Sequence, residues 1–415
     1  MADIYIILAY ILSYIGLFAA VFYAISLFTH YKKGKEPEPK EDKKVSILIP
    51  AYNEEETIVK TIKSALSLNY PKEKLEIIVI DDGSKDKTYE IAMAVASKEK
   101  RVKVFRKKNG GKGTALNFGI KKARGEIIVS MDADTTVDRD SLRRMVGFFY
   151  NDDVMLVSPS MGVINPRSIW QRIQQIEYYM GVFLRKSFAT INAIHVTPGA
   201  FSAYRKEYFD KHGGYEEDNL TEDLELALRI QSHGYIIENA PKSCAYTKGP
   251  KGFRELLIQR RRWYAGLIKN LWAYRRLFGF KHGALGTVVL PVAVVTVFLS
   301  VFLTSYVISR ALSELWKELL SLQSINFQFK DAYELNSYLF ENFFLLLTTQ
   351  PIILISGVFI LFLGMYVYFS KSQMRYKESI SFGFVLFVTL YSFVFTIWWL
   401  VSVIYVAFNR EVKWR

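Results

Sequence analysis

Residues 45–54 read Val-Ser-Ile-Leu-Ile-Pro-Ala-Tyr-Asn-Glu. The aliphatic run Val45–Ile49 has the length and composition of a buried strand, and a polar turn follows it. Two later runs of this kind end in acids, which are Asp81-Asp82 after Glu76–Ile80 and Asp132-Ala-Asp134 after Ile127–Met131. Ligands of parallel sheets bind beyond the carboxyl ends of the strands, so these acids predict one shared site.

Helical patterns separate the strand-like runs. We expect further strands at Val102–Phe105 and Met155–Ser158, and helices at Glu54–Ser67, Asp86–Ser97 and Gly113–Ala123. The alternation predicts an α/β fold, with a mostly parallel mixed sheet and helices on both faces.

Four apolar stretches are long enough to cross about 30 Å of hydrocarbon. They are approximately Ile4–Thr29, Gly283–Ser309, Phe343–Ser370 and Ile380–Phe408. The first is expected to be a retained anchor, because its apolar core is too long for a secretory signal and lysines follow it. The expected organisation is an N-terminal transmembrane helix (1–31), a linker (32–44), an α/β domain (45–250), an interfacial segment (251–282) and three transmembrane helices with loops (283–415).

Charge is concentrated beside these stretches. The formal net charge is +14, and residues 251–282 hold nine Lys or Arg against one acid. Aromatic and aliphatic residues interleave with them, which is typical of a helix on an anionic leaflet and disfavours a nucleic-acid partner. Two of the spans, 283–309 and 380–408, contain no Asp, Glu, Lys, Arg or His. This disfavours a transporter or channel, which needs such groups within its spans.

The positive-inside rule predicts the orientation. Residues 32–44 and 251–282 should face the cytosol, whereas the acidic segment 310–342 should lie outside. Both termini are then expected outside. The basic tail after Phe408 argues against this for the C-terminus, and a re-entrant last segment would explain it. The one cysteine, Cys244, excludes an intrachain disulfide and is expected to be a small buried residue.

Asp132-Ala-Asp134 spaces two carboxylates so that one can hold a ribose or base and the other a divalent cation, Mg²⁺ or Mn²⁺. Such a cation would neutralise a diphosphate leaving group. Triplets of this type are also common turns, and Asp82-Gly-Ser is equally a good turn.

Three further motifs carry candidate chemistry. Thr221-Glu222-Asp223 precedes a helical run, so Thr221 is either a helix cap or the start of a motif in which Asp223 is a general base. Residues 199–205 are expected to form a loop against the acceptor. Gly110 to Gly113 lacks the P-loop spacing, which disfavours ATPase activity, but Lys112 is placed to meet a phosphate at a helix start.

In Gln259-Arg-Arg-Arg262-Trp263, a guanidinium can bind a diphosphate bidentately and the indole can stack on a sugar ring. The alternative interpretation is an interfacial amphipathic helix, and the two are compatible. A second, weaker amphipathic helix is expected around Trp170, Arg172, Ile173, Ile176 and Phe183.

Taken in this order, residues 44–275 resemble the membrane-embedded family 2 glycosyltransferases, which include cellulose, chitin, hyaluronan and poly-N-acetylglucosamine synthases. One span before the domain and three after it are similar to the arrangement of chitooligosaccharide synthases. The resemblance implies a GT-A fold, a nucleotide-sugar donor that is usually UDP-linked, Mg²⁺ or Mn²⁺, and inversion at the anomeric carbon.

The resemblance also assigns roles to residues. It implies donor binding by Pro50, Tyr52, Glu54, Asp81, Asp82, Lys112, Asp132 and Asp134, with Asp134 on the metal. It makes Asp223 the catalytic base, with Glu222 beside it. Gly199, Gln259, Arg262 and Trp263 would line the acceptor and diphosphate end of the site.

The leading hypothesis is therefore a processive inverting glycosyltransferase of the cell membrane, which elongates a polysaccharide on the cytosolic face and exports it. The alternative is a non-processive relative that adds one sugar to a lipid or short acceptor. The expected partners are a nucleotide sugar, the growing glycan or lipid acceptor, and membrane lipids. The resemblance departs at the C-terminal end, where we find no regulatory domain and no clear gating-loop motif, which puts activation by a cyclic dinucleotide in doubt. With few spans, a homodimer or a partner subunit would complete a channel.

Overall fold

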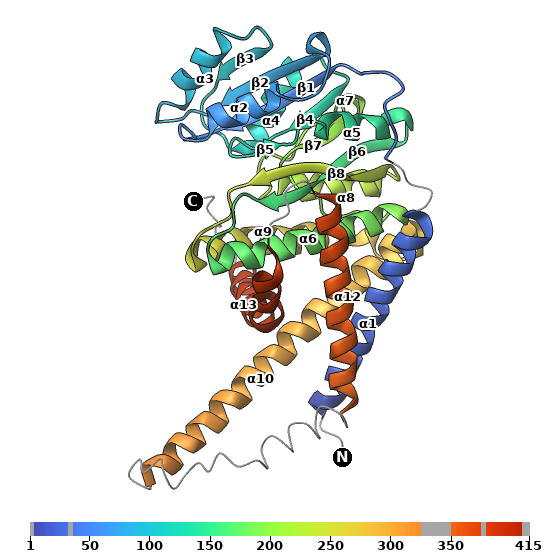
Figure 1. Cartoon of the computed structure of the whole chain (residues 1–415), viewed down its shortest axis with the longest axis vertical. Coiled ribbons are helices and arrows are strands. Elements are labelled where there is room, and N and C mark those ends of the chain that lie inside the picture. The colour runs from blue at the N-terminus through green and yellow to red at the C-terminus, as the bar shows by residue number, and fades with distance from the viewer. Residues whose placement is uncertain (1–3, 32–35, 325–349, 375–378, 409–415) are drawn as a thin grey trace.

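The computed structural model describes residues 4–31, 36–324, 350–374 and 379–408. These residues form three levels along the longest axis of the molecule (Figure 1). An α/β domain lies at one end, two long helices lie across its base, and apolar helices extend away from it.

Eight strands form one mixed sheet in the order β3-β2-β1-β4-β7-β6-β8-β5. Strands β3, β2, β1 and β4 are parallel to one another, and β6 is parallel to β8, whereas β7 and β5 run antiparallel to the strands beside them. The strands are β1 (Val45–Ala51), β2 (Leu75–Asp81), β3 (Val102–Arg106), β4 (Ile127–Ser130), β5 (Thr136–Val137), β6 (Val154–Val163), β7 (Ser202–Arg205) and β8 (Ile236–Thr247).

The five expected strands are confirmed within a few residues, and three more are present. The expectation of a loop over residues 199–205 was wrong in its second half, because Ser202–Arg205 is β7 and pairs with β4. The strand β8 was also missed. It is interrupted by a register shift against β6 between Pro159 and Ser160, so its residues do not follow one alternating pattern.

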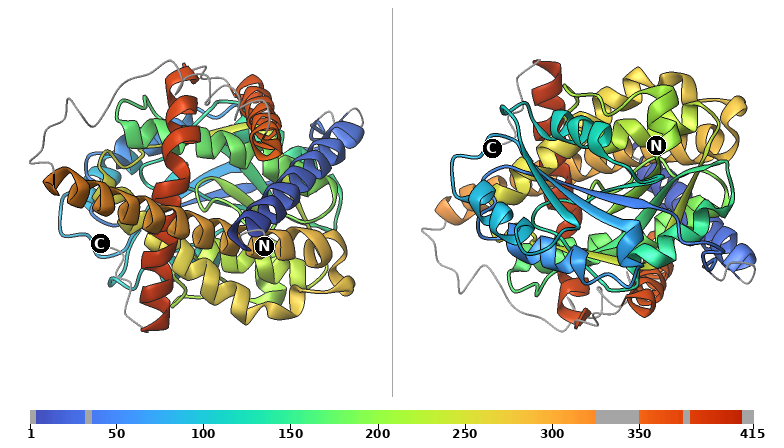
Figure 2. Two further views of the ribbon diagram at one scale, coloured as in Figure 1. Left: turned by 90° about the horizontal axis from the view of Figure 1, so that it is seen from below. Right: turned by 90° about the horizontal axis from the view of Figure 1, so that it is seen from above.

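Helices cover both faces of the sheet, as expected (Figure 2). In β1, Ile47 and Ile49 pack on one face with Ile58 of α2, while Leu48 packs on the other with Leu116 of α4. This alternation follows from the two-residue period of a strand. The helices of the domain are α2 (Ile58–Leu66), α3 (Thr88–Ala96), α4 (Lys112–Lys122), α5 (Ser141–Val146), α7 (Lys206–His212) and α8 (Glu222–Ser232).

The two amphipathic helices predicted from the sequence are α6 (Ile169–Thr190) and α9 (Phe253–Ala273). They lie between the sheet and the apolar helices (Figure 1). A complete capping box starts α6, because Ser168 and Gln171 each accept a backbone amide of the other. Short 3-10 turns and a π-helical turn, Leu285–Val289, then connect α9 to the next helix.

Within the described part of the chain, four helices are long and apolar enough to cross a membrane, which agrees with the number expected from the sequence. They are α1 (Ile4–Tyr31), α10 (Leu290–Ser324), α12 (Pro351–Gln373) and α13 (Ser381–Ala407). The expected stretch 343–370 begins outside the described residues. Helices α1 and α12 run along the long axis, whereas α13 is seen nearly end-on in Figure 1 and lengthwise from below in Figure 2. Helix α13 therefore runs across the direction of α12, packed against α6 and α9.

Cys244 lies in β8 and is 1% exposed, which confirms the expectation of a buried cysteine. Its sulfur belongs to a cluster that joins the sheet to α6 and α12 through Tyr179 and Val367. The lower side of the α/β domain and the helices beneath it thus share one apolar interface.

Candidate active site

The loops after β1 and β2 brace each other at the carboxyl edge of the sheet. Asn53 has a left-handed backbone conformation (φ 54°), and its amide donates to Oγ of Ser84 at 3.0 Å. Pro50 lies within β1, and Tyr52 and Glu54 follow it in the braced loop, where all three are partly exposed. The structure therefore holds these predicted donor-binding residues at one strand end.

The two acids after β2 have different surroundings. Asp81 is fully buried, with its Oδ2 2.9 Å from Nε of Arg106, which neutralises its charge. Asp82 accepts from Nζ of Lys107 at 2.6 Å and from the amide of Gly111 at 2.7 Å. Asp82 thus fixes the glycine-rich turn that begins α4.

Lys112, the first residue of α4, connects carboxylates from two distant segments. Its Nζ lies 2.7 Å from Oδ1 of Asp132 and 3.2 Å from Oε1 of Glu222. A Cβ added to Gly199 would lie 2.8 Å from that Nζ and 2.7 Å from Oδ2 of Asp223. Four other predicted site residues, namely Asp132, Gly199, Glu222 and Asp223, therefore meet around the ammonium group of Lys112.

The charges at this centre oppose one another. Burial alone would lower the pKa of Lys112, but the three nearby carboxylates raise it above its ordinary value. Burial and the charge of Glu222 raise the pKa of Asp223 to about 6, although Lys112 acts in the opposite direction. A carboxylate with this pKa is ionised at neutral pH and remains basic enough to accept a proton.

Asp134 completes the group of carboxylates at the end of β4. Burial, followed by the negative charges of Asp132 and Glu54, raises the pKa of Asp134 to about 6. Its Oδ2 accepts from Oγ1 of Thr247 at 3.2 Å. Asp134 carries no ion pair among the residues that the structure describes, so the negative charge beside Asp132 is only partly neutralised.

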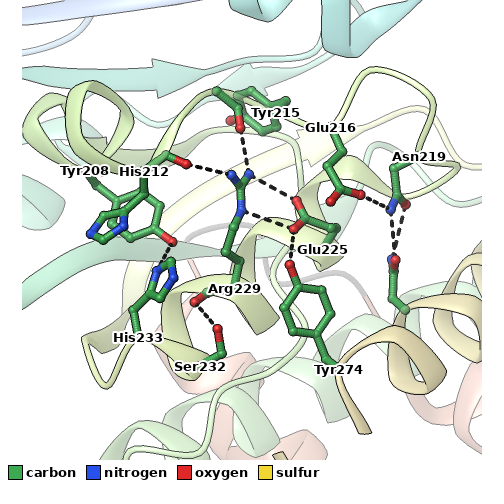
Figure 3. A network of polar contacts seen from close by, with 12 residues as sticks. Tyr208, His212, Tyr215, Glu216, Asn219, Glu225, Arg229, Ser232, His233 and Tyr274 are labelled. Carbon is green, nitrogen blue, oxygen red and sulfur yellow. Dashed lines mark hydrogen bonds and ion pairs between the residues drawn. The ribbon is translucent and has the colours of Figure 1, made fainter. Parts of the chain in front are cut away.

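Polar contacts fix α8, which carries Glu222 and Asp223, to α9 (Figure 3). Glu225 accepts from the hydroxyl of Tyr274 and pairs with Arg229, whose Nε lies 3.1 Å from Oε1 of Glu225. Asn270 of α9 donates to Oγ1 of Thr221 at 3.0 Å. Thr221 occupies the N-cap position of α8, as the cap interpretation predicted, but its side chain makes no capping hydrogen bond.

The segment of α9 from Gln259 to Trp263, called the run below, faces α6. The side-chain oxygen of Gln259 accepts from Nε2 of Gln174 at 2.9 Å. Gln259, Arg262 and Trp263 are spaced three and four residues apart, so they share a side of the helix, and all are partly exposed. One turn later, a Cβ at Gly266 would lie 2.3 Å from Oγ1 of Thr221. The run therefore lies about one helical turn from the Glu222-Asp223 pair.

Residues 46–213 match the sequence pattern described as glycosyl transferase family 2. This part of the chain is a family 2 glycosyltransferase domain. The whole chain is similar in structure to a mannosyltransferase from Pyrobaculum calidifontis, solved with GDP-Man and Mn²⁺, with a TM-score of 0.57 and 20% identity. That alignment covers 96% of this chain and 100% of the other, and it shows a common GT-A fold.

Two staphylococcal relatives extend the sequence similarity beyond the domain. The chain is 32% identical over 257 residues to a poly-β-1,6-N-acetyl-D-glucosamine synthase of Staphylococcus aureus, which is 60% of each protein. It is 33% identical over 235 residues to the synthase of Staphylococcus epidermidis, which is 55% of this chain and 57% of the relative. The chain thus matches less than two thirds of the length of these relatives.

Sequence reasoning missed one ionic contact beneath the glycosyltransferase domain. Arg260 is 1% exposed, and its guanidinium pairs with Glu177 of α6 and stacks 4.3 Å from the ring centre of Trp263. Tyr391 of α13 donates to the same Glu177 at 3.2 Å. The available signal was an acid, Glu177, within the apolar pattern of an interfacial helix, because such an acid usually has a partner.

Proposed function

We propose that this chain is an inverting glycosyltransferase that uses a nucleotide sugar, UDP-linked, to elongate a polysaccharide at the cytosolic face of the cell membrane. The observation that carries this proposal is the meeting of Lys112, Asp132, Glu222 and Asp223 at the carboxyl edge of the parallel strands. These residues lie above two amphipathic helices and four apolar helices. Acids assembled in this way provide a base and a phosphate-binding edge next to a bilayer.

Within this proposal, the loops after β1 and β2 hold the nucleotide, and Lys112 meets the diphosphate. Asp223 accepts the proton of the acceptor hydroxyl as that oxygen attacks the anomeric carbon. Glu222, paired with Lys112, keeps Asp223 basic through its charge. The side of α9 that carries Gln259, Arg262 and Trp263 then contacts the acceptor.

Asp132 and Asp134 fit a divalent cation. They are two hard oxygen donors two residues apart, and the negative charges around Asp134 raise its pKa. The described residues contain no group of three or more His, Cys, Asp or Glu arranged for a metal, so donor phosphates and water would complete the coordination. Bound Mg²⁺ or Mn²⁺ supplies neutralisation of charge on a leaving diphosphate.

The test is release of nucleotide by the purified full-length protein with Mn²⁺. UDP-N-acetylglucosamine is the first donor to try, because of the similarity to the two synthases, followed by UDP-glucose, UDP-glucuronate and GDP-mannose. Asp223→Asn should lower turnover by about 10²–10⁴-fold while nucleotide binding is retained. Release from none of the four donors, or normal turnover in that variant, refutes the proposal.

Product length separates processive synthesis from the alternative of one sugar added to a lipid or short acceptor. The partly exposed side of α9 that carries Gln259, Arg262 and Trp263 supports the processive version, because it can hold a sugar that has already been added beside the proposed acceptor site. Long chains formed while most acceptor is still unused would support processivity. A product with a single added sugar would establish the alternative.

A further inference from the structure

One face of α6 carries polar groups that the proposed mechanism does not use. Gln174, Tyr178, Gly181 and Arg185 are spaced four, three and four residues apart, so they lie along the same face of the helix. Nε2 of Gln174 donates to Gln259 of α9 at 2.9 Å and lies 3.4 Å from the hydroxyl of Tyr178. This face therefore begins at the proposed acceptor-binding run.

Arg185 folds back along this face toward the N-terminal end of α6. A Cβ added to Gly181 would lie 3.0 Å from Nη1 of Arg185, so the guanidinium covers the glycine one turn before it. Arg185 and Tyr178 interact electrostatically, and Tyr178 also interacts with the charge of Asp134. Glycine is unfavourable within a helix. At Gly181, the absence of a side chain leaves room for the guanidinium of Arg185.

The guanidinium of Arg185 has no counterion among the residues that the structure describes. Its Nε and Nη2 atoms are buried and have no hydrogen-bond partner among the described residues, and no described carboxylate lies within 4.0 Å of it. Oε1 of Gln174, on the same face, is also buried without a partner. Burial lowers the pKa of Arg185 to about 10, and the group remains charged at neutral pH. A buried, unpaired cation is costly, and an anion from a ligand removes most of that cost.

We propose that Gln174, Tyr178 and Arg185 line an acceptor subsite that takes an oxyanion, a phosphate or a carboxylate, carried by the acceptor. A phenol ring together with unpaired donors and an unpaired acceptor atom is the set of groups that a sugar ring requires. The guanidinium additionally requires a negatively charged group, which it can bind bidentately. This inference rests on the proposed sugar transfer, and it names the class of acceptor.

The acceptor, and not the donor, supplies this oxyanion because of where α6 lies. The donor diphosphate is expected at Lys112 and at the ends of β2 and β4, whereas α6 lies with α9 on the side of the sheet that faces the apolar helices (Figure 1). A lipid-linked phosphate or a uronic acid reaches Arg185 from that side.

The test measures binding, so it does not depend on turnover. Full-length protein in nanodiscs is titrated with two matched pairs: farnesyl phosphate against farnesol, and a glucuronate-terminated tetrasaccharide against a neutral N-acetylglucosamine tetrasaccharide. We expect the charged member of one pair to bind at least about tenfold more tightly than its neutral partner. The pair that shows the preference identifies the source of the oxyanion.

Arg185→Gln should abolish that preference, and Arg185→Lys should retain part of it. Arg172→Gln is the matched control, because Arg172 is on the same helix but stacks on Phe382 of α13 at 5.6 Å. Donor affinity, measured separately with the nucleotide sugar, should be unchanged in all three variants.

Three results overturn the inference: no charge preference in either pair, a preference that survives Arg185→Gln, or loss of donor affinity in place of acceptor affinity. If Arg185→Gln does not fold, Arg185→Lys decides the question. A reduced charge preference in Arg185→Lys supports the inference, and an unchanged preference overturns it. Nucleotide release without any charge preference would refute the subsite and leave the proposed sugar transfer standing. Charge preference without nucleotide release would support the subsite and refute the proposed sugar transfer.

Discussion

Gly199→Ala tests the geometry of the proposed active site with one added methyl group. The new Cβ would lie 2.7 Å from Oδ2 of Asp223 and 2.8 Å from Nζ of Lys112, whereas ordinary contacts begin near 3.4 Å. Both groups must then retreat by about 0.6–0.7 Å, the difference between these distances. Each is the end of a side chain, so the fold should tolerate the change.

Catalysis should tolerate it much less. A misplacement of about 1 Å can cost on the order of 10²-fold in rate. We therefore expect kcat to fall by about 10- to 100-fold, or about 1.4–2.7 kcal/mol in the activation barrier. Initial rates of nucleotide release, with the midpoint of thermal unfolding measured on the same sample, check this expectation.

Gly252→Ala is the matched control, because no atom lies within 4 Å of a Cβ built at Gly252. It should leave kcat unchanged. If Gly199→Ala retains kcat within about twofold of the wild-type value, Asp223 and Lys112 are not held where the mechanism needs them. A large fall in thermal stability in Gly199→Ala would equally refute the claim that only side-chain ends must move.

Three further predictions concern the same centre. The rate should rise about tenfold per pH unit below pH 6 and level off above it, because Asp223 must be ionised to accept a proton and its pKa is raised to about 6; a flat rate profile between pH 4.5 and 7 would contradict this. Lys112→Met should destabilise the protein by about 3 kcal/mol, since it leaves Glu222, which is 3% exposed, without its cation. Urea unfolding measures the loss, Lys112→Arg should restore part of it, and equal stability in all three proteins would refute the pairing. Asn270→Ala should lower the free energy of unfolding by about 1–2 kcal/mol in the same assay, and should also lower kcat, because it removes a hydrogen bond between α9 and Thr221. Lys269→Ala, at the exposed neighbouring position, is the control and should change neither quantity.

Much of the domain could be predicted because its parallel strands are short and mostly aliphatic, and two of them, β2 and β4, lead into acids. Strand β1, for example, is buried on both faces, so a mostly aliphatic run fits there. Strand β8 could not be predicted in the same way. Its residues include Asn239 and Ser243, buried by contacts with β6 that exist only in the folded protein.

The candidate site shows the same division. Turns and spacing pointed to Asp132 and Asp223, but the ion pairs of Lys112 with Asp132 and Glu222 join residues up to 110 positions apart and follow from the tertiary fold alone. The pairing of Arg260 with Glu177 is of the same kind. The direction of α13 was equally invisible, because a uniformly apolar helix has no side that records which way it lies.

The burial of Cys244 makes the chain a ready subject for thiol labelling. The protein has one cysteine, and it is 1% exposed, so the native thiol is shielded from reagents in water. A cysteine introduced beyond either end of α13 would then be the single reactive one. Membrane-impermeant maleimides applied to sealed vesicles of opposite orientation would report directly which compartment each end of that helix faces.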